Sequence, residues 1–296
     1  MRAELLAALA ALCWAVGSLF SATASSRMGA FAFTRWRLMF ATLMLWALSA
    51  WTGQWHSLDA AAVAWLGLSG FIGIFVGDTA LFACMNRLGP RRCGLLFATH
   101  ALFSAALAWV FLGESLWGWT LVGSTVLVSG VMTAIAWGRR GDETHDWERT
   151  RGQLRTGVAL GVLAALGQSV ATLMIKPLMS TGVDAVSASA VRTSVALGAH
   201  LVLLWAGWPL ARMQQPLDAR TFWNTAASAW IAMALGMTLI LWALRDGQAN
   251  LVGIFSSITP VLLLPLLWGV YRRRPASGAW VGAALVVAGS VLIVLG

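Results

Sequence analysis

Charged residues are scarce in this chain of 296 residues: they make up 10% of it, whereas 59% of the residues are hydrophobic. Cysteines are also few, and the three present have neither the spacing of metal ligands nor the even number of a disulfide framework. No phosphate-binding loop of the GxxxxGK[ST] type occurs, so the sequence offers no recognisable site for ATP. We therefore expect no metal site and no cofactor.

Long apolar runs account for most of the chain, whose mean hydropathy is +0.77. Runs of this length predict α-helices that cross a lipid bilayer. Ten runs can be delimited, at 3–22, 31–51, 62–85, 92–112, 117–137, 156–178, 184–206, 222–244, 250–270 and 277–295. The expected fold class is an all-α polytopic membrane protein.

The polar segment 137–155 divides the chain into two halves, 1–136 and 156–296, with five apolar runs each. Because five is odd, the second half must enter the bilayer from the side opposite to the first. This predicts two inverted five-helix repeats joined by a polar linker, a plan common among secondary transporters. The sequence supports the repeat, since Gly77–Glu114 can be laid over Leu235–Arg272 with Gly89 on Gly247.

The net charge of +9 arises from arginines in short loops between apolar runs, a pattern typical of topology determinants rather than of nucleic-acid binding. Loops after odd-numbered runs carry fourteen arginines, whereas the opposite side carries three basic residues. The positive-inside rule then places the odd-numbered loops and the linker in the cytoplasm and both termini outside. We expect the protein in a bacterial cytoplasmic (inner) membrane.

Several short motifs occur in the same order along the chain. They are Trp14, Arg35, Gly77-Asp78-Thr79, Leu112-Gly113-Glu114, Gly123 with Gly130, Pro260, and Gly282 with Gly289. Together they resemble the EamA-type family of the drug/metabolite transporter superfamily, over nearly the whole chain. The resemblance implies a ten-helix carrier in which runs one to four and six to nine wall a cavity and the fifth and tenth pack at the periphery. It also implies efflux of amino acids, related metabolites or drugs.

Asp78 is the only acid well inside an apolar run. An ionisable group there is costly and normally faces a cavity or a partner. Asp78 is therefore either a substrate-amine or proton site, or one half of a structural ion pair with Arg35 or Arg192.

Arg35 and Arg192 fall opposite each other when the two halves are compared. A guanidinium at this depth can hold a carboxylate or phosphate through two hydrogen bonds. The alternative, which is favoured at Arg35 and nearby Arg37, is that the side chain reaches back to the headgroups. Arg192 lies deeper and is the better candidate for substrate binding.

Other polar or aromatic residues inside the runs have two interpretations each. His100 and His200 either relay protons or are hydrogen-bonded within the helix bundle. Trp14 either lines the cavity or only packs. Ser256, Ser257 and Thr259 either contact a polar solute or satisfy the carbonyl that Pro260 leaves without a donor.

The sequence favours a secondary transporter, more specifically an exporter of a small metabolite, amino acid or drug by alternating access, with a proton gradient or exchange as its energy source. The lipid bilayer and a small-molecule substrate are the expected partners. An enzyme is disfavoured, because paired acids, a His/Asp dyad or a metal cluster near one interface are missing, and the linker acids are interleaved with arginines. A membrane scaffold without transport and a carrier of a lipid-linked substrate stay open as alternatives.

Overall fold

The computed structural model describes residues 3–114, 117–137, 153–271 and 277–295, and every regular element in these ranges is a helix. The first half contains α1 (Ala3–Met28), α2 (Ala30–Thr52), α3 (Ala60–Gly70), η2 (Phe71–Asp78), α4 (Thr79–Ala98), α5 (His100–Leu112) and α6 (Gly118–Trp137). The second contains α7 (Leu154–Met179), α8 (Ala185–Trp205), α9 (Ala219–Ser228), η5 (Ala229–Leu235), α10 (Gly236–Asp246), α11 (Ala249–Ser256), α12 (Thr259–Tyr271) and α13 (Ser277–Leu295). The short 3₁₀ helices η1 (Gln54–Ser57) and η4 (Pro209–Ala211) lie in connections.

Six helical stretches in the described part of the chain are long and apolar enough to cross a membrane, and shorter apolar helices accompany them. The prediction of an all-α polytopic membrane protein is thereby confirmed in its main point. The number of ten crossings and the inverted repeat stay predictions. Residues 138–152, most of the predicted linker, lie outside the described residues.

The third and eighth apolar runs each contain a π-helical segment that hydropathy does not reveal: η2 separates α3 from α4, and η5 separates α9 from α10. Small residues allow another helix to approach closely at these points. The hydroxyl of Ser69 donates to the carbonyl of Ala171, 2.8 Å away, and a Cβ on Gly73 would lie 2.6 Å from the Cβ of Ala171. The π segment η2 therefore coincides with a close contact between the two halves, and a Cβ on Gly17 of α1 would likewise collide with the Cβ of Ala232 in η5.

The fourth and ninth runs are also interrupted, where the sequence suggested one continuous helix each. Thr99 separates α4 from α5, and Ser257 and Ile258 separate α11 from α12. At these points the backbone N–H groups bond to the carbonyl three residues earlier, as in a 3₁₀ helix. Examples are Thr99 N to Leu96 O at 3.2 Å and Ser257 N to Ile254 O at 3.1 Å. The overlay of the two halves sets Thr99 on Ser257, so both interruptions fall at matching positions.

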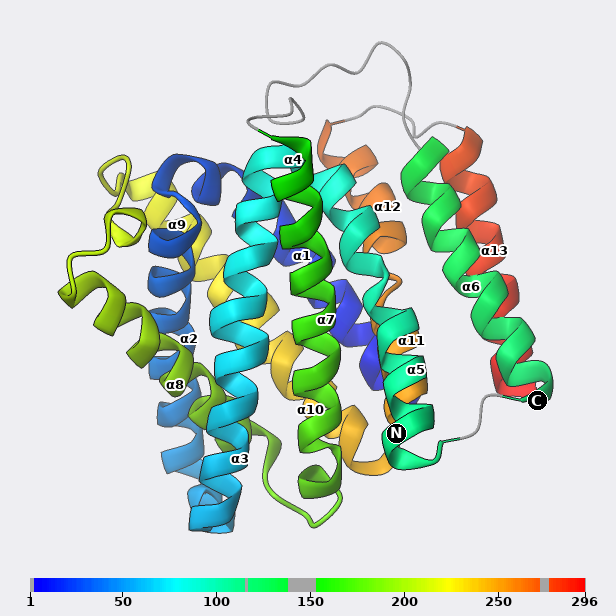
Figure 1. Cartoon of the computed structure of the whole chain (residues 1–296), viewed down its shortest axis with the longest axis horizontal. Helices are drawn as coiled ribbons and strands as arrows, with labels where there is room; N and C mark the ends of the chain where they lie inside the picture. The colour runs from blue at the N-terminus through cyan, green and yellow to red at the C-terminus, as the bar shows by residue number, and fades with distance from the viewer. Residues whose placement is uncertain (1–2, 115–116, 138–152, 272–276, 296) are drawn as a thin grey trace.

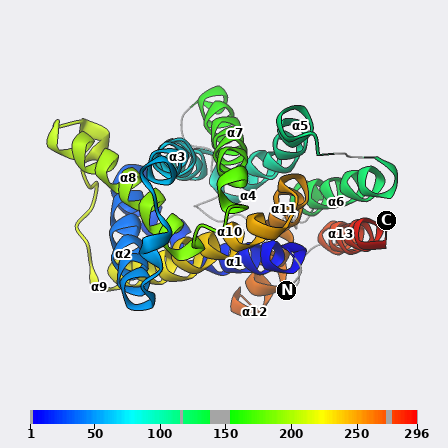
Figure 2. The same cartoon turned by 90° about the horizontal axis from the view of Figure 1, so that it is seen from below.

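The first helix of each half packs against helices of the other half. α1 contacts α9, η5 and α10 of the second half, whereas α7 contacts α4 and η2 of the first half. In Figures 1 and 2, α1 and α7 each lie beside helices of the other half. The largest group of buried apolar side chains includes residues of α1, α7, α10 and α11.

α6 and α13 form a separate pair at one edge of the molecule (Figure 1). Their glycines let the two backbones touch: a Cβ on Gly289 would lie 2.6 Å from the carbonyl oxygen of Gly123. A Cβ on Gly130 would lie 2.7 Å from the carbonyl oxygen of Gly282. The four glycines that the sequence comparison aligned thus meet in one interface, and helix association through small residues explains the pairing.

Candidate functional site

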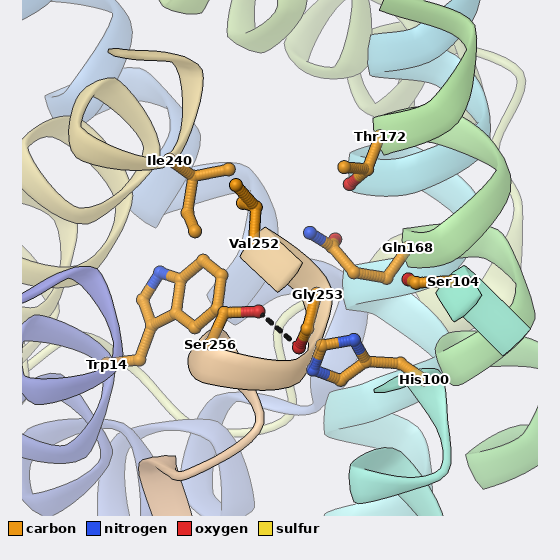
Figure 3. A pocket seen from close by; sticks show the side chains of 9 residues that line it. All are labelled: Trp14, His100, Ser104, Gln168, Thr172, Ile240, Val252, Gly253 and Ser256. Atoms are coloured by element: carbon orange, nitrogen blue, oxygen red, sulfur yellow. Dashed lines mark hydrogen bonds between the residues drawn. The ribbon is translucent and has the colours of Figure 1, made fainter. Parts of the chain in front are cut away.

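A small internal cavity lies where α1, α5, α7, α10 and α11 meet (Figure 3). Its volume is about 10 Å³, which is room for about one water molecule. It is lined by Trp14, His100, Ser104, Gln168, Thr172, Ile240, Val252, Gly253 and Ser256. Three predicted site residues, Trp14, His100 and Ser256, are thus brought together from helices far apart in the sequence.

The cavity has one apolar and one polar wall (Figure 3). Trp14, Ile240 and Val252 form the apolar wall, and the indole nitrogen of Trp14 donates to the carbonyl of Ala232, 3.0 Å away in η5. This bond fixes the indole ring, so Trp14 both lines the cavity and ties α1 to the second half. The polar wall comes from α5 and α7, which carry His100 and Gln168.

Both interrupted helices contribute to this cavity. His100 begins α5 directly after the interruption at Thr99, and Ser256 ends α11 directly before the interruption at Ser257. The break at Thr99 is anchored to α7, because the hydroxyl of Ser169 donates to the carbonyl of His100 at 2.9 Å. The hydroxyl of Ser104 in turn donates to that of Ser169 at 3.1 Å.

The side chain of His100 retains free hydrogen-bonding capacity. Its Nε2 atom is buried and has no hydrogen-bond partner among the described residues. The hydroxyl of Ser256 instead donates to the carbonyl of Gly253, 2.9 Å away. The cavity therefore offers a polar group to a ligand opposite an apolar wall.

Ser257 and Thr259 do not line the cavity. The hydroxyl of Ser257 donates to the carbonyl of Ile254 at 2.7 Å, and that of Thr259 donates to the carbonyl of Ser256 at 3.0 Å. The Ser256 carbonyl is the one that Pro260 deprives of its helical donor. Of the two interpretations of this patch, the structure thus favours backbone satisfaction for these two hydroxyls.

A second polar cluster lies between α2, η2, α8 and α10. Asp78, at the end of η2, accepts a hydrogen bond from Nη1 of Arg37 at 3.1 Å. The guanidinium of Arg37 also lies 5.2 Å from the centre of the Phe82 ring. Asp78 is therefore in an ion pair, but its partner is Arg37 rather than Arg35 or Arg192. The expectation that Arg37 reaches the headgroups is wrong, because its position on α2 directs it toward Asp78 in the interior.

Arg192, on α8, is 1% exposed and has no carboxylate within ion-pair distance in the described part of the chain. Its Nη1 atom donates to the thioether sulfur of Met237 at 2.8 Å. Its Nε and Nη2 atoms are buried and have no hydrogen-bond partner among the described residues. Arg192 lies close enough to Asp78 for an electrostatic interaction between them.

Arg35 belongs to neither cluster, although the sequence pairs it with Arg192. It is 9% exposed, and its Nη1 atom donates to the carbonyl of Ala211 in η4, 2.7 Å away. This bond holds the connection between α8 and α9 against α2. The neighbouring connection thus offers a carbonyl that accepts one hydrogen bond of the guanidinium within the protein, and the alternative that the side chain reaches the headgroups stays a prediction. His200 is likewise bound within the bundle, with Nε2 3.1 Å from the hydroxyl of Thr79.

The sequence interpretation missed Gln168, Thr172 and Ser104. Gln168 is an amide in the middle of an apolar run, which is a signal for a polar contact inside a bundle. Its position on α7 opposite Trp14 depends on how the halves pack, so the sequence alone did not link the two. The three or more His, Cys, Asp or Glu side chains that a metal site would require are not grouped anywhere in the described ranges.

Comparison with known proteins gives one family. The model of the EamA-like transporter family matches residues 1–136 and 155–295. Among curated proteins, none matches the chain. A solved structure described only as "Crystal structure of protein" is 19% identical, has a TM-score of 0.75, and covers 100% of this chain and 98% of its own. At this identity the likeness shows the fold alone.

Proposed function

The chain belongs to the EamA-like transporter family, and from this we propose that it is a secondary transporter that exports a small metabolite, amino acid or drug by alternating access. Its ten predicted spans would form two inverted five-helix repeats, 1–136 and 156–296, that rock against each other. The driving force would be a proton gradient or exchange. The arginine bias supports cytoplasmic odd-numbered loops and extracytoplasmic termini in a bacterial inner membrane.

The observation that carries this proposal is the cavity at the two helix interruptions. Secondary transporters bind their solutes where discontinuous helices from two repeats meet, because the interruption exposes backbone and side-chain polar groups inside the membrane. Here His100 and Ser256 adjoin matching interruptions in the two halves, and both line the same cavity. The crosswise contacts of α1 with η5 and of α7 with η2 are also what an inverted repeat would produce.

The cavity of about 10 Å³ is too small for a metabolite, which supports an occluded state between inward and outward openings. Alternating access would enlarge it on one side at a time. We propose that the solute then lies against Trp14, with its polar groups toward His100 and Gln168. A scaffold without transport would not require a cavity with one polar and one apolar wall.

The first test is a thermal-shift panel of amino acids, organic cations and phosphorylated metabolites on the protein purified in detergent. A ligand at about 100 times its Kd stabilises a protein by about 2.7 kcal/mol if it binds only the folded state. The panel is repeated on His100→Ala and Gln168→Ala, with His56→Ala as the matched control because His56 is exposed in η1.

A compound that stabilises the protein and its control, but not the two cavity variants, identifies the solute class. Reconstitution into liposomes with that compound then has to show flux. Binding that is unchanged in both cavity variants would refute the site. The absence of flux with a bound compound would refute the transporter and favour a scaffold or a carrier of a lipid-linked substrate.

A further inference from the structure

We propose that the guanidinium of Arg192 binds the carboxylate group of the transported solute, through its Nε and Nη2 atoms. This assignment rests on the proposed transport function, because it names the chemical class of the solute. It is argued from the cluster of Arg37, Asp78 and Arg192, which lies next to the cavity rather than in its lining.

The cluster contains more positive than negative charge. Arg37 and Arg192 each carry a positive charge at neutral pH, and Asp78 supplies one carboxylate. In the described parts of α2, η2, α8 and α10, the other acid is Asp246, which is exposed at the end of α10. An uncompensated charge in a low-dielectric interior is strongly unfavourable, and a bound anion would neutralise it.

One edge of the Arg192 guanidinium, formed by Nε and Nη2, has no hydrogen-bond partner among the described residues. Asp78 is bonded to Arg37, and Arg192 has only a thioether, a weak acceptor, on Nη1. The Nε–H and Nη2–H groups lie side by side on one edge of the planar guanidinium, and neither has a partner among the described residues. This edge matches the two oxygens of a carboxylate, which it can bind through two parallel hydrogen bonds.

Arg192 lies close to α10 and α7, two of the helices that wall the cavity. Met237, which contacts Arg192, is one turn before Ile240 of the apolar wall on α10. A Cβ on Gly73 would lie 3.4 Å from Nη2 of Arg192 and would also touch Ala171, the neighbour of Thr172 in the cavity lining. In this proposal, movement of the flexible Met237 side chain opens the route from the cavity to Arg192.

The test compares benzoate with benzamide. Both have a ring suited to the apolar wall, and benzamide has the shape of benzoate without its charge. Binding of each is measured by thermal shift and titration calorimetry on the detergent-purified full chain. The variants are Arg192→Gln, Arg192→Lys and Asp78→Asn. Arg27→Gln is the control, because Arg27 is an exposed arginine at the end of α1.

We expect benzoate to bind and benzamide not to bind. Arg192→Gln should weaken benzoate binding by about tenfold or more, the effect of losing charge-assisted hydrogen bonds. Arg192→Lys keeps the charge without the planar edge and should bind with intermediate strength. Asp78→Asn removes the competing negative charge and should tighten binding, whereas Arg27→Gln should leave it unchanged.

Equal binding of benzamide, unchanged benzoate binding in Arg192→Gln, or no binding of benzoate by the unmodified protein would each overturn the proposal. Stabilisation by inorganic phosphate or chloride equal to that by benzoate would overturn the carboxylate assignment. If Arg192→Gln fails to fold, the tighter benzoate binding expected in Asp78→Asn still tests the proposal. Binding without flux in liposomes would refute the transport function but not the Arg192 site. Flux of a solute without a carboxylate would refute the Arg192 site but not the transport function.

Discussion

The Nη1 atom of Arg37 lies 3.1 Å from a carboxylate oxygen of Asp78, and the two side chains are 7% and 15% exposed. The pair joins α2 to η2 in the interior of the first half. Since a second guanidinium, that of Arg192, lies nearby without a carboxylate of its own, the ionic cluster is unbalanced. Its stability and its ligand binding should therefore depend on the same few charges.

Removal of one partner of this pair should destabilise the protein more than removal of both. Asp78→Ala leaves Arg37 buried without its partner, and breaking a buried pair in this way costs about 3–5 kcal/mol. The double variant Asp78→Ala/Arg37→Met should recover part of that loss, because Met replaces the buried charge by an apolar side chain. Denaturation of the two single variants, the double variant and the unmodified protein in detergent measures the coupling, and purely additive effects would contradict it.

Gly289 should tolerate no larger residue, because α6 and α13 touch there. Gly289→Ala should destabilise by about 1–3 kcal/mol through overpacking. Gly269→Ala in α12 is the matched control, since no atom lies within 4 Å of the added Cβ. That change should be neutral or stabilise by up to about 1 kcal/mol through helix propensity. Equal thermal denaturation temperatures for the two variants would refute the close contact.

Substitutions at Gly17 in α1 and Ala232 in η5 should compensate for each other. A Cβ on Gly17 would collide with the Cβ of Ala232, so Gly17→Ala should destabilise the contact between the two halves. Adding Ala232→Gly removes the obstacle and should restore the thermal denaturation temperature. Without this restoration, the loss in Gly17→Ala would have to come from elsewhere.

Glu114 should act as the N-terminal cap of α11. Its Oε1 and Oε2 atoms accept hydrogen bonds from the backbone N–H groups of Ala249 and Asn250 at 2.7 and 2.9 Å. Glu114→Ala should cost about 0.5–2 kcal/mol, as the loss of a helix cap does. Glu114→Gln should cost less, because its amide oxygen still accepts. Chemical denaturation compares the three proteins, and a Gln variant as unstable as the Ala variant would contradict this order.

The stability contributed by Asp218 should depend on pH. Hydrogen bonds from Thr221, followed by the interaction with Arg27, lower the pKa of Asp218 from its usual 3.8 to about 2. A lowered folded-state pKa means that this contribution is complete above about pH 4 and is lost as the pH falls through about 2. Asp218→Ala should therefore melt at a lower temperature than the unmodified protein at neutral pH, and the difference should shrink below about pH 4.

Asp246→Ala is the control for that measurement, because Asp246 is exposed and its salt bridge, at 3.3 Å, is with the adjacent and also exposed Arg245. It should change the melting temperature little at any pH. A difference for Asp218→Ala that persists undiminished to about pH 2 would show that the carboxylate charge is not what stabilises this end of α9.

The position of the helices followed from the sequence because each apolar run is long enough to bury its own backbone hydrogen bonds in lipid, whatever its neighbours are. The π segments and the interruptions at Thr99 and Ser257 did not follow from it. These depend on contacts with other helices, such as that of Ser69 with Ala171, and hydropathy does not register them.

The candidate site was only partly predictable. Trp14, His100 and Ser256 stood out as polar or aromatic residues in apolar runs, and the structure brings them together. Gln168 carries the same kind of signal but was not recognised, since its importance comes from facing Trp14 across the bundle. Which residues share a cavity depends on the rotation of each helix about its axis.

By itself, the sequence determined that the protein is helical, that it belongs in a membrane and that Asp78 faces either a cavity or a partner, because the cost of burying apolar and charged groups is a property of the residues. The tertiary structure alone decided that this partner is Arg37 and that Arg192 keeps an unpaired edge. Residues 35 and 37 are about 200° apart around α2, and only the packing of α2 on α8 and η5 determines which of them faces Asp78.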